Sequence, residues 1–155
     1  MCEYCGCQAV PAIRDLTREH DEVVALISRV RAAHSRGDVT VMAELVTRIA
    51  RVLGPHTAVE EEGLFPALAD EFPGHIAGLT AQHRVIETVV GEAAGGVPAD
   101  PGWPARLLET LHLLREHILA EQDGVFPAAL SRLDPAAWDA IDMVRRRVGP
   151  AERTN

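Results

Sequence analysis

The apolar positions of this chain recur at alternating steps of three and four residues, which is the pattern of amphipathic helices that bury one face. The four stripes run from Ile13 to His34, from Met42 to Val59, from Ile76 to Val90 and from Leu107 to Val125. No segment alternates convincingly between apolar and polar residues with a period of two, so no strands are predicted. Four long helices with short connections predict an all-α, up-down-up-down four-helix bundle.

Glycine, proline and aspartate mark the expected ends of these helices. Gly37 should stop the first helix, and Asp38 can cap the second. The pair Gly54-Pro55 falls inside the second stripe, where we expect a kink about one turn earlier because proline removes a backbone donor. These positions predict a bent second helix.

The third helix is expected to end at Gly95-Gly96, before a loop rich in proline and glycine that reaches Pro101. Asp134 followed by Pro135 is typical of a helix start, since proline suits the first helical position. The sequence therefore predicts a short additional C-terminal helix that ends at about Arg147.

Length and composition favour one soluble globular domain. The 155 residues are 47% hydrophobic and 25% charged, with only 4% aromatic residues. We divide the chain into a cysteine-containing tail (1–9), a helical domain (10–148) and a frayed tail (149–155). The net charge of −8 argues against a nucleic-acid partner. Neither a membrane-spanning run of about 18 apolar residues nor a signal peptide is visible, so a cytoplasmic location without membrane attachment is expected.

The chain contains an internal repeat with an offset of about 61 to 63 residues. The segment 16–20 (LTREH) matches 79–83 (LTAQH), and 56–66 (HTAVEEEGLFP) matches 117–127 (HILAEQDGVFP). Each half is thus a helix hairpin with a histidine on one helix and His-x-x-x-Glu on the next. Positions i and i+4 lie about 40° apart around a helix and about 6 Å along it. One turn therefore aims an imidazole and a carboxylate at the same point.

The repeat collects six residues whose chemistry suits metal ions: His20, His56, Glu60, His83, His117 and Glu121. The alternative is that they are satisfied polar residues in a bundle interior, but burying six such groups without a cation would cost on the order of several kcal/mol. Imidazole with carboxylate is a ligand set for iron, with zinc or manganese as alternatives. If both carboxylates bridge two metals, each metal has two nitrogens and two oxygens and retains open positions.

With these motifs, the chain from about residue 10 to residue 130 resembles the hemerythrin-like, or HHE cation-binding, family of four-helix bundles. The resemblance implies two non-haem iron ions, bridged by Glu60 and Glu121 and by an oxo or hydroxo group. It implies that one iron takes His20 and His56 and that the other takes the histidines of the second half, His83 and His117. This arrangement is the four-histidine, two-glutamate type.

The sequence departs from oxygen-carrying hemerythrins in two ways. Leu79 stands where those proteins have a fifth histidine, and Glu121 follows His117 by four residues and not by five. The pattern is closer to members such as bacterial iron-centre repair proteins. The resemblance therefore favours binding or reduction of a small oxidant (dioxygen, nitric oxide or hydrogen peroxide), with an electron donor as a further partner, over plain reversible oxygen carriage.

Two further features of the sequence, Glu87 and three cysteines near the N-terminus, are weaker candidates for metal chemistry. Glu87 lies one turn after His83, so it is either an alternative ligand or a partner of a ligand or of solvent. Cys2, Cys5 and Cys7 are denser than chance and would suit an extra metal, a redox dithiol or an unstructured tail. Whether the protein is an enzyme stays open at this stage, because a non-catalytic oxygen or iron store or sensor, or a structural zinc bundle, would need the same residues.

Overall fold

The computed structural model describes residues 10–150, and all the regular structure in that range is helical. The long helices are α1 (Pro11–Ser35), α2 (Val39–Val59), α4 (Pro73–Gly91) and α5 (Trp103–Ala120). A π-helical turn, η2 (Glu60–Leu64), and then α3 (Phe65–Leu68) continue α2 directly. In the same way η3 (Glu121–Val125) and α6 (Phe126–Arg132) continue α5, and α7 (Pro135–Val148) is the last helix.

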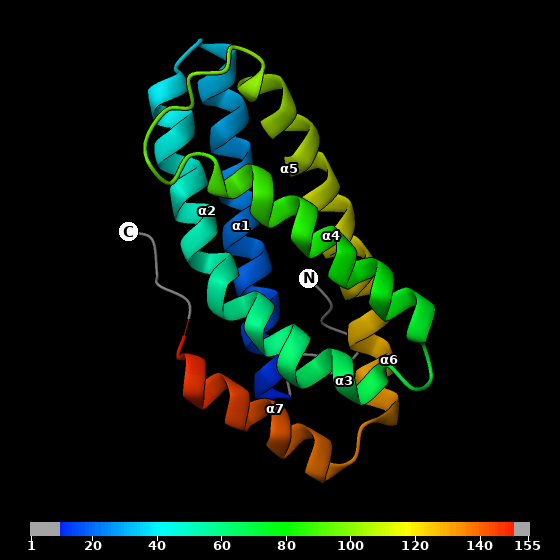
Figure 1. The fold of residues 1–155 in the computed structure, drawn as a ribbon. Helices are drawn as coiled ribbons and strands as arrows, with labels where there is room; N and C mark the ends of the chain where they lie inside the picture. The colour runs from blue at the N-terminus through cyan, green and yellow to red at the C-terminus, as the bar shows by residue number, and fades with distance from the viewer. Residues whose placement is uncertain (1–9, 151–155) are drawn as a thin grey trace.

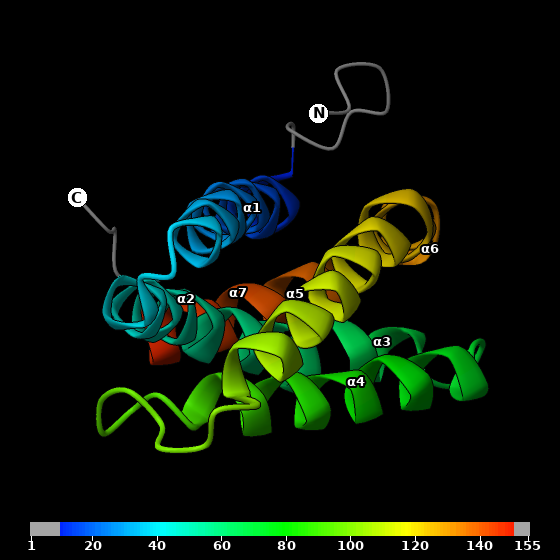
Figure 2. The ribbon, with the colours of Figure 1, turned by 90° about the horizontal axis from the view of Figure 1, so that it is seen from above.

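The four long helices run alternately up and down, which confirms the predicted all-α bundle (Figure 1). The predicted additional C-terminal helix is also present: α7 lies across one end of the bundle and packs against α1, α2 and η2 (Figures 1 and 2). The chain therefore has four helices that can surround an interior and a fifth that covers part of it.

The helix ends follow the predicted capping chemistry at two places. The carboxylate of Asp38 accepts a hydrogen bond from the backbone N–H of Val41, and that of Asp134 accepts one from Ala137. α4 ends at Gly91, earlier than the expected Gly95, and short turns follow it. The capping residues therefore predicted the starts of α2 and α7 more accurately than the glycines predicted the end of α4.

The helix is not broken at the expected kink, about one turn before Pro55. α2 continues through Pro55 to Val59, and the backbone widens only in η2. Pro55 removes a hydrogen bond to the carbonyl of Arg51, but Arg51 is solvent-exposed. Water can hydrogen-bond to a carbonyl on the outer side of a helix, so the helix tolerates this proline.

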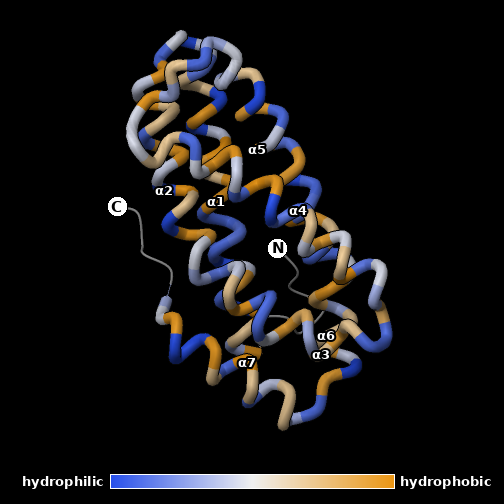
Figure 3. Tube along the Cα trace, viewed as in Figure 1, coloured by the Kyte–Doolittle hydropathy of each residue, from blue (hydrophilic) through white to orange (hydrophobic). Residues whose placement is uncertain are grey.

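The apolar interior consists of two separate clusters of buried side chains, one toward each end of the bundle. Figure 3 shows the apolar positions that recur along each helix. On α1, the first cluster begins at Val23 and the second ends at Leu16, so the residues between them belong to neither. The same interruption occurs on α2 between Leu53 and Val59. The bundle therefore has a polar layer between two apolar ones.

Among the described residues, none of the helices combines the length and the apolar character that crossing a membrane requires.

Candidate metal centre

The polar layer consists of the six residues that the repeat singled out. The histidines come from four different helices, and the two glutamates begin the π-helical turns η2 and η3. All are buried, with no side chain more than 5% exposed: His20, His56, Glu60, His83, His117 and Glu121. Residues separated by up to about 100 positions in the chain thus meet in the middle of the bundle.

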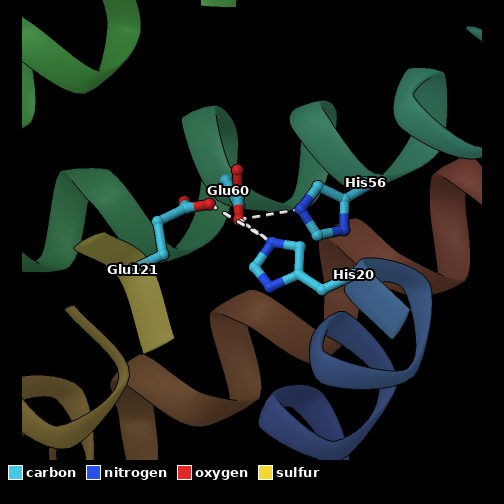
Figure 4. A group of neighbouring side chains, drawn as sticks. All are labelled: His20, His56, Glu60 and Glu121. Atoms are coloured by element: carbon cyan, nitrogen blue, oxygen red, sulfur yellow. Dashed lines mark ion pairs between the residues drawn. The ribbon is translucent and has the colours of Figure 1, made fainter. Parts of the chain in front are cut away.

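These residues form two groups of four that share both carboxylates. His20 and His56 lie with Glu60 and Glu121 in one group, which Figure 4 shows converging on Glu60. The second group replaces the two histidines with His83 and His117. Within each group one nitrogen or oxygen atom from every residue lies within 4.8 Å of the others. This division matches the two ligand sets that the family resemblance implied.

The Glu60 carboxylate faces both halves of the repeat. Its Oε1 atom lies 2.9 Å from His56 Nε2 and 3.9 Å from His20 Nε2. Its Oε2 atom lies 3.1 Å from His83 Nε2. One oxygen thus points to each half, as a bridging carboxylate would require.

Glu121 complements this arrangement from the start of η3, directly after α5. Its Oε1 atom lies 3.2 Å from His117 Nε2, one turn earlier on the same helix, and 3.3 Å from His20 Nε2 on α1. These contacts connect a histidine of each half to one carboxylate. Glu60 and Glu121, which occupy equivalent repeat positions, thus each contact histidines of both halves.

Although these contacts are short, most do not have hydrogen-bond geometry. The atoms that remain without a hydrogen-bond partner are both oxygens of Glu60 and of Glu121, both ring nitrogens of His20, His83 Nδ1 and His117 Nε2. Buried polar atoms without a partner are rare in proteins and costly. The four carboxylate oxygens and the Nε2 atoms of His20 and His117 converge, and such a set fits divalent cations, which would satisfy these atoms together.

The charges in this layer shift the proton affinities of its members. Burial lowers the pKa of His56, but the negative charge of Glu60 and contacts with Glu19 and Glu60 outweigh it and raise that pKa to about 10. Burial raises the pKa of Glu60, and the charge of His56 more than reverses this effect, so the pKa lies well below its ordinary value. Burial also lowers the pKa of His83, but the contact with Glu60 and its negative charge outweigh this effect and raise that pKa above its ordinary value. His56 and His83 thus favour positive charge beside Glu60, and Glu60 favours negative charge beside them.

The π-helical turns have a local cause in the repeated Phe-Pro pair. Pro66 and Pro127 have no backbone N–H, and a proline ring inside a helix collides with the carbonyl four residues earlier. The helix widens by one residue, so the N–H of Phe65 donates to the carbonyl of Glu60 and that of Phe126 to Glu121. Each candidate bridging carboxylate thus starts a widened turn, a feature that often occurs at functional sites.

The same pair supplies an aromatic ring to the opposite half of the repeat. Phe65 stacks on His83, with ring centroids 5.6 Å apart and an interplanar angle of 10°. Phe126 stacks on His20 at 5.5 Å and 11°. Each half therefore restrains an imidazole ring of the other, a role that the sequence reasoning did not assign although both phenylalanines belong to the repeat.

Three of the outward-facing Nδ1 atoms lie near polar side chains outside the predicted ligand set. His56 Nδ1 lies 3.3 Å from Glu19 Oε1, and His117 Nδ1 lies 2.8 Å from Gln82 Oε1. His83 Nδ1 lies 3.4 Å from Glu61 Oε1. Glu19 and Gln82 occupy equivalent repeat positions, immediately before a histidine, and that equivalence was the signal in the sequence.

Glu87, the alternative ligand, belongs to neither group of four. Its side chain is 44% exposed, and its Oε2 atom accepts a hydrogen bond from Arg84 at 2.5 Å. Cys2, Cys5 and Cys7 lie outside the described residues, so the expectations for them stay predictions.

A small, mainly apolar cavity borders the polar layer. Besides site residues, its lining contains the apolar side chains Leu53, Ile86, Leu114 and Ile118, together with Thr57 and Glu87. It has room for roughly one water-sized molecule. Only a very small ligand can therefore reach the candidate centre without movement of the surrounding side chains.

A four-helix bundle with a buried layer of four histidines and two shared glutamates defines a class of cation-binding proteins. The comparison with family models agrees: the hemerythrin HHE cation-binding domain model matches residues 12–129. The chain belongs to this family. Searches among curated proteins and among solved structures gave no match.

Proposed function

We propose that the chain is a non-haem diiron protein that binds or reduces a small oxidant, namely dioxygen, nitric oxide or hydrogen peroxide. The observation that carries the proposal is the pair of four-residue groups that share two buried carboxylates whose oxygens have no hydrogen-bond partner. One iron would be held by His20 and His56, and the other by His83 and His117. Glu60 and Glu121 would touch both.

The ligand set supports iron over a closed structural site. Each group offers two imidazoles and two shared carboxylates, so an ion that accepts five or six ligands retains free positions. Structural zinc sites are instead four-coordinate and are usually rich in cysteine, whereas both groups found among the described residues offer histidine and glutamate. When bound, the two irons would supply Lewis acidity and electrons for reduction.

The residues around the centre support a very small substrate. The apolar walls formed by Leu53, Ile86 and Leu114 exclude bulk water and leave room for a molecule of roughly the size of water. Thr57 adds a hydroxyl group to the lining, which can donate a hydrogen bond to a polar end of the ligand. The protein would therefore bind, orient and shield the oxidant.

The oxidant hypothesis also agrees with the position of Leu79. This residue is 3% exposed and belongs to the apolar cluster below the polar layer. No fifth histidine fills an open position there, so both halves present the same number of imidazoles. We propose an electron donor as a further partner, because reduction of peroxide or nitric oxide consumes electrons.

The test is anaerobic loading of the metal-free protein with Fe²⁺, followed by separate additions of the three oxidants. Consumption of peroxide or nitric oxide over several turnovers, with an electron donor present, supports the proposal. Reversible, stoichiometric binding of dioxygen supports the binding form of the same proposal. A protein that takes up zinc and rejects iron from a mixture of the two would contradict it. His56→Ala is the matched control, since it removes one ligand from the first group only.

A further inference from the structure

The C-terminal helix reaches the candidate metal centre through one side chain, Arg145. α7 lies beyond residues 12–129, the range that the family model matches. Arg145 Nη2 donates a hydrogen bond to Glu19 Oε1 at 2.6 Å, and Nη1 donates to Glu19 Oε2 at 3.1 Å. Glu19 Oε1 also lies 3.3 Å from His56 Nδ1. A chain of polar contacts thus runs from α7 to a candidate metal ligand.

Glu19 depends on Arg145 because of its burial. The carboxylate residue is 1% exposed, and an ionised carboxylate in such a place needs a cation beside it. The planar guanidinium group meets both carboxylate oxygens, which is the strongest geometry for this pair. Arg145 Nη1 also donates to the carbonyl of Gly149 at 3.3 Å, just after the end of α7. The position of α7 therefore sets the position of Glu19.

In the second half of the repeat, the side chain that supports a histidine carries no charge. Gln82 precedes His83 as Glu19 precedes His20, and Gln82 Oε1 accepts the hydrogen bond from His117 Nδ1 at 2.8 Å. A neutral amide needs no counter-cation. The two halves are therefore alike in their ligands and unlike in what supports one histidine of each pair.

We propose that Glu19 is a positioning residue for His56, that Arg145 holds Glu19 in place, and that α7 thereby acts on the first half of the metal centre only. This inference rests on the dimetal centre of the proposed function. When Nδ1–H donates to a carboxylate, the other ring nitrogen, Nε2, keeps its lone pair for a metal. In His56 that atom faces Glu60 at 2.9 Å.

The experiment is a titration of the metal-free, full-length protein with Co²⁺, followed by visible absorption. Wild type should bind two ions. Arg145→Met should weaken the binding of one ion by roughly 10- to 100-fold and leave the affinity for the other unchanged, as expected for loss of a residue that orients a ligand. Arg147→Met is the matched control on the same helix. Arg147 pairs with Glu62 at the surface, so this variant should bind both ions as wild type does.

A second set of variants separates positioning from folding. Glu19→Gln gives the first half the acceptor that the second half already has, so it should keep both ions. In that background Arg145→Met should have no further effect on Co²⁺ binding, because the amide needs no guanidinium partner. A double-mutant cycle measures this dependence. The melting temperatures of the metal-free variants are measured as well. If Arg145 had a purely structural role, its loss would lower the affinity for both ions in parallel with the stability of the protein.

The outcomes distinguish this inference from the proposed function. Wild-type protein that binds no Co²⁺ contradicts the dimetal centre itself. Wild type that binds two ions, with Arg145→Met weakening both equally or neither, contradicts the role of Arg145 and leaves the centre standing. An equal effect of Arg145→Met in the wild-type and Glu19→Gln backgrounds also contradicts it, because Arg145 would then act without Glu19.

Discussion

At the scale of single residues, Glu60 and Glu121 differ from the other acidic side chains that face the site. Both are fully buried, and both have two oxygens without a hydrogen-bond partner. Glu19 is also buried but has Arg145 as its cation. Glu61 and Glu87 lie nearer the surface and share Arg84. In the part of the chain that the structure describes, Glu60 and Glu121 contact histidines, whereas the other three carboxylates each pair with an arginine.

We predict that Glu60→Ala and Glu121→Ala behave alike and cost more than Glu87→Ala. Removal of a shared carboxylate takes an oxygen ligand from both ions and leaves two cations close together at low dielectric. Loss of Glu87 should cost at most about 10- to 100-fold in affinity, the range for a residue that only supports a ligand. Iron content and melting temperature of the three variants, measured side by side, check this.

The opposite ranking would contradict the assignment of the bridging residues. If Glu87→Ala empties the site while Glu121→Ala keeps both irons, α4 supplies the carboxylate and η3 does not. Glu116→Ala is a suitable surface control, because Glu116 follows His112 by four residues and both are exposed.

The six inner residues were predictable because a four-residue spacing fixes direction along a helix, and because the motif occurs twice. Their supporting residues were not. Glu19 and Gln82 act on a histidine more than thirty positions away, and this pairing depends on how neighbouring helices rotate about their axes. Arg145 lies outside the repeat, so no internal comparison could connect it with Glu19. Stacking of Phe65 and Phe126 across the halves likewise appears only after the bundle is assembled.

At the scale of helices, three prolines inside helical segments differ in their effect on the backbone. The helix widens into a π-helical turn before Pro66 and before Pro127. α2 instead continues through Pro55 with α-helical geometry. The residues four positions before these prolines, Arg51, Glu62 and Asp123, are all exposed. A proline in the sequence therefore predicts a missing hydrogen bond, but exposure of the affected residue does not decide whether the helix widens.

The glycines of the two repeated motifs provide a prediction at this scale. A Cβ atom on Gly63 would lie 3.2 Å from the Cα atom of Ile141 on α7, whereas one on Gly124 would meet no atom within 4 Å. Gly63→Ala should therefore destabilise the protein by about 1–3 kcal/mol through overpacking. Gly124→Ala should be neutral or stabilising by up to about 1 kcal/mol, because alanine favours helical backbone more than glycine.

Thermal or urea unfolding of the two variants checks this difference. Each kcal/mol corresponds to roughly 2–4 °C in melting temperature for a chain of this size. Equal effects of Gly63→Ala and Gly124→Ala would mean that α7 does not pack closely on η2, and the contact from Arg145 to Glu19 would lose its structural support.

At the scale of the whole molecule, a polar layer separates two apolar clusters, and its charges need compensation. Metal removal should therefore lower stability. Each bound ion stabilises the folded state by about 2.7 kcal/mol when its free concentration is 100 times its dissociation constant. Two ions would raise the melting temperature by on the order of 10–20 °C at that concentration. Calorimetry before and after treatment with a chelator measures the shift, and an unchanged melting temperature would contradict coupling between metal binding and folding.

The division of the chain gives a further prediction. Deletion of residues 1–8 removes Cys2, Cys5 and Cys7 but none of the repeat, so iron content and the visible absorption of the iron centre should not change. Metal analysis and a spectrum of the shortened protein check this. A large loss of either would mean that the N-terminal segment contributes to the centre.

Metal stoichiometry decides whether each half of the repeat holds one metal ion. Protein purified from iron-replete cells, or reloaded anaerobically with Fe²⁺, is analysed for metal per chain, together with His83→Ala and His117→Ala. We expect two irons per chain in the wild type and a lower value in both variants. A reproducible value of one iron that neither substitution changes would contradict this expectation.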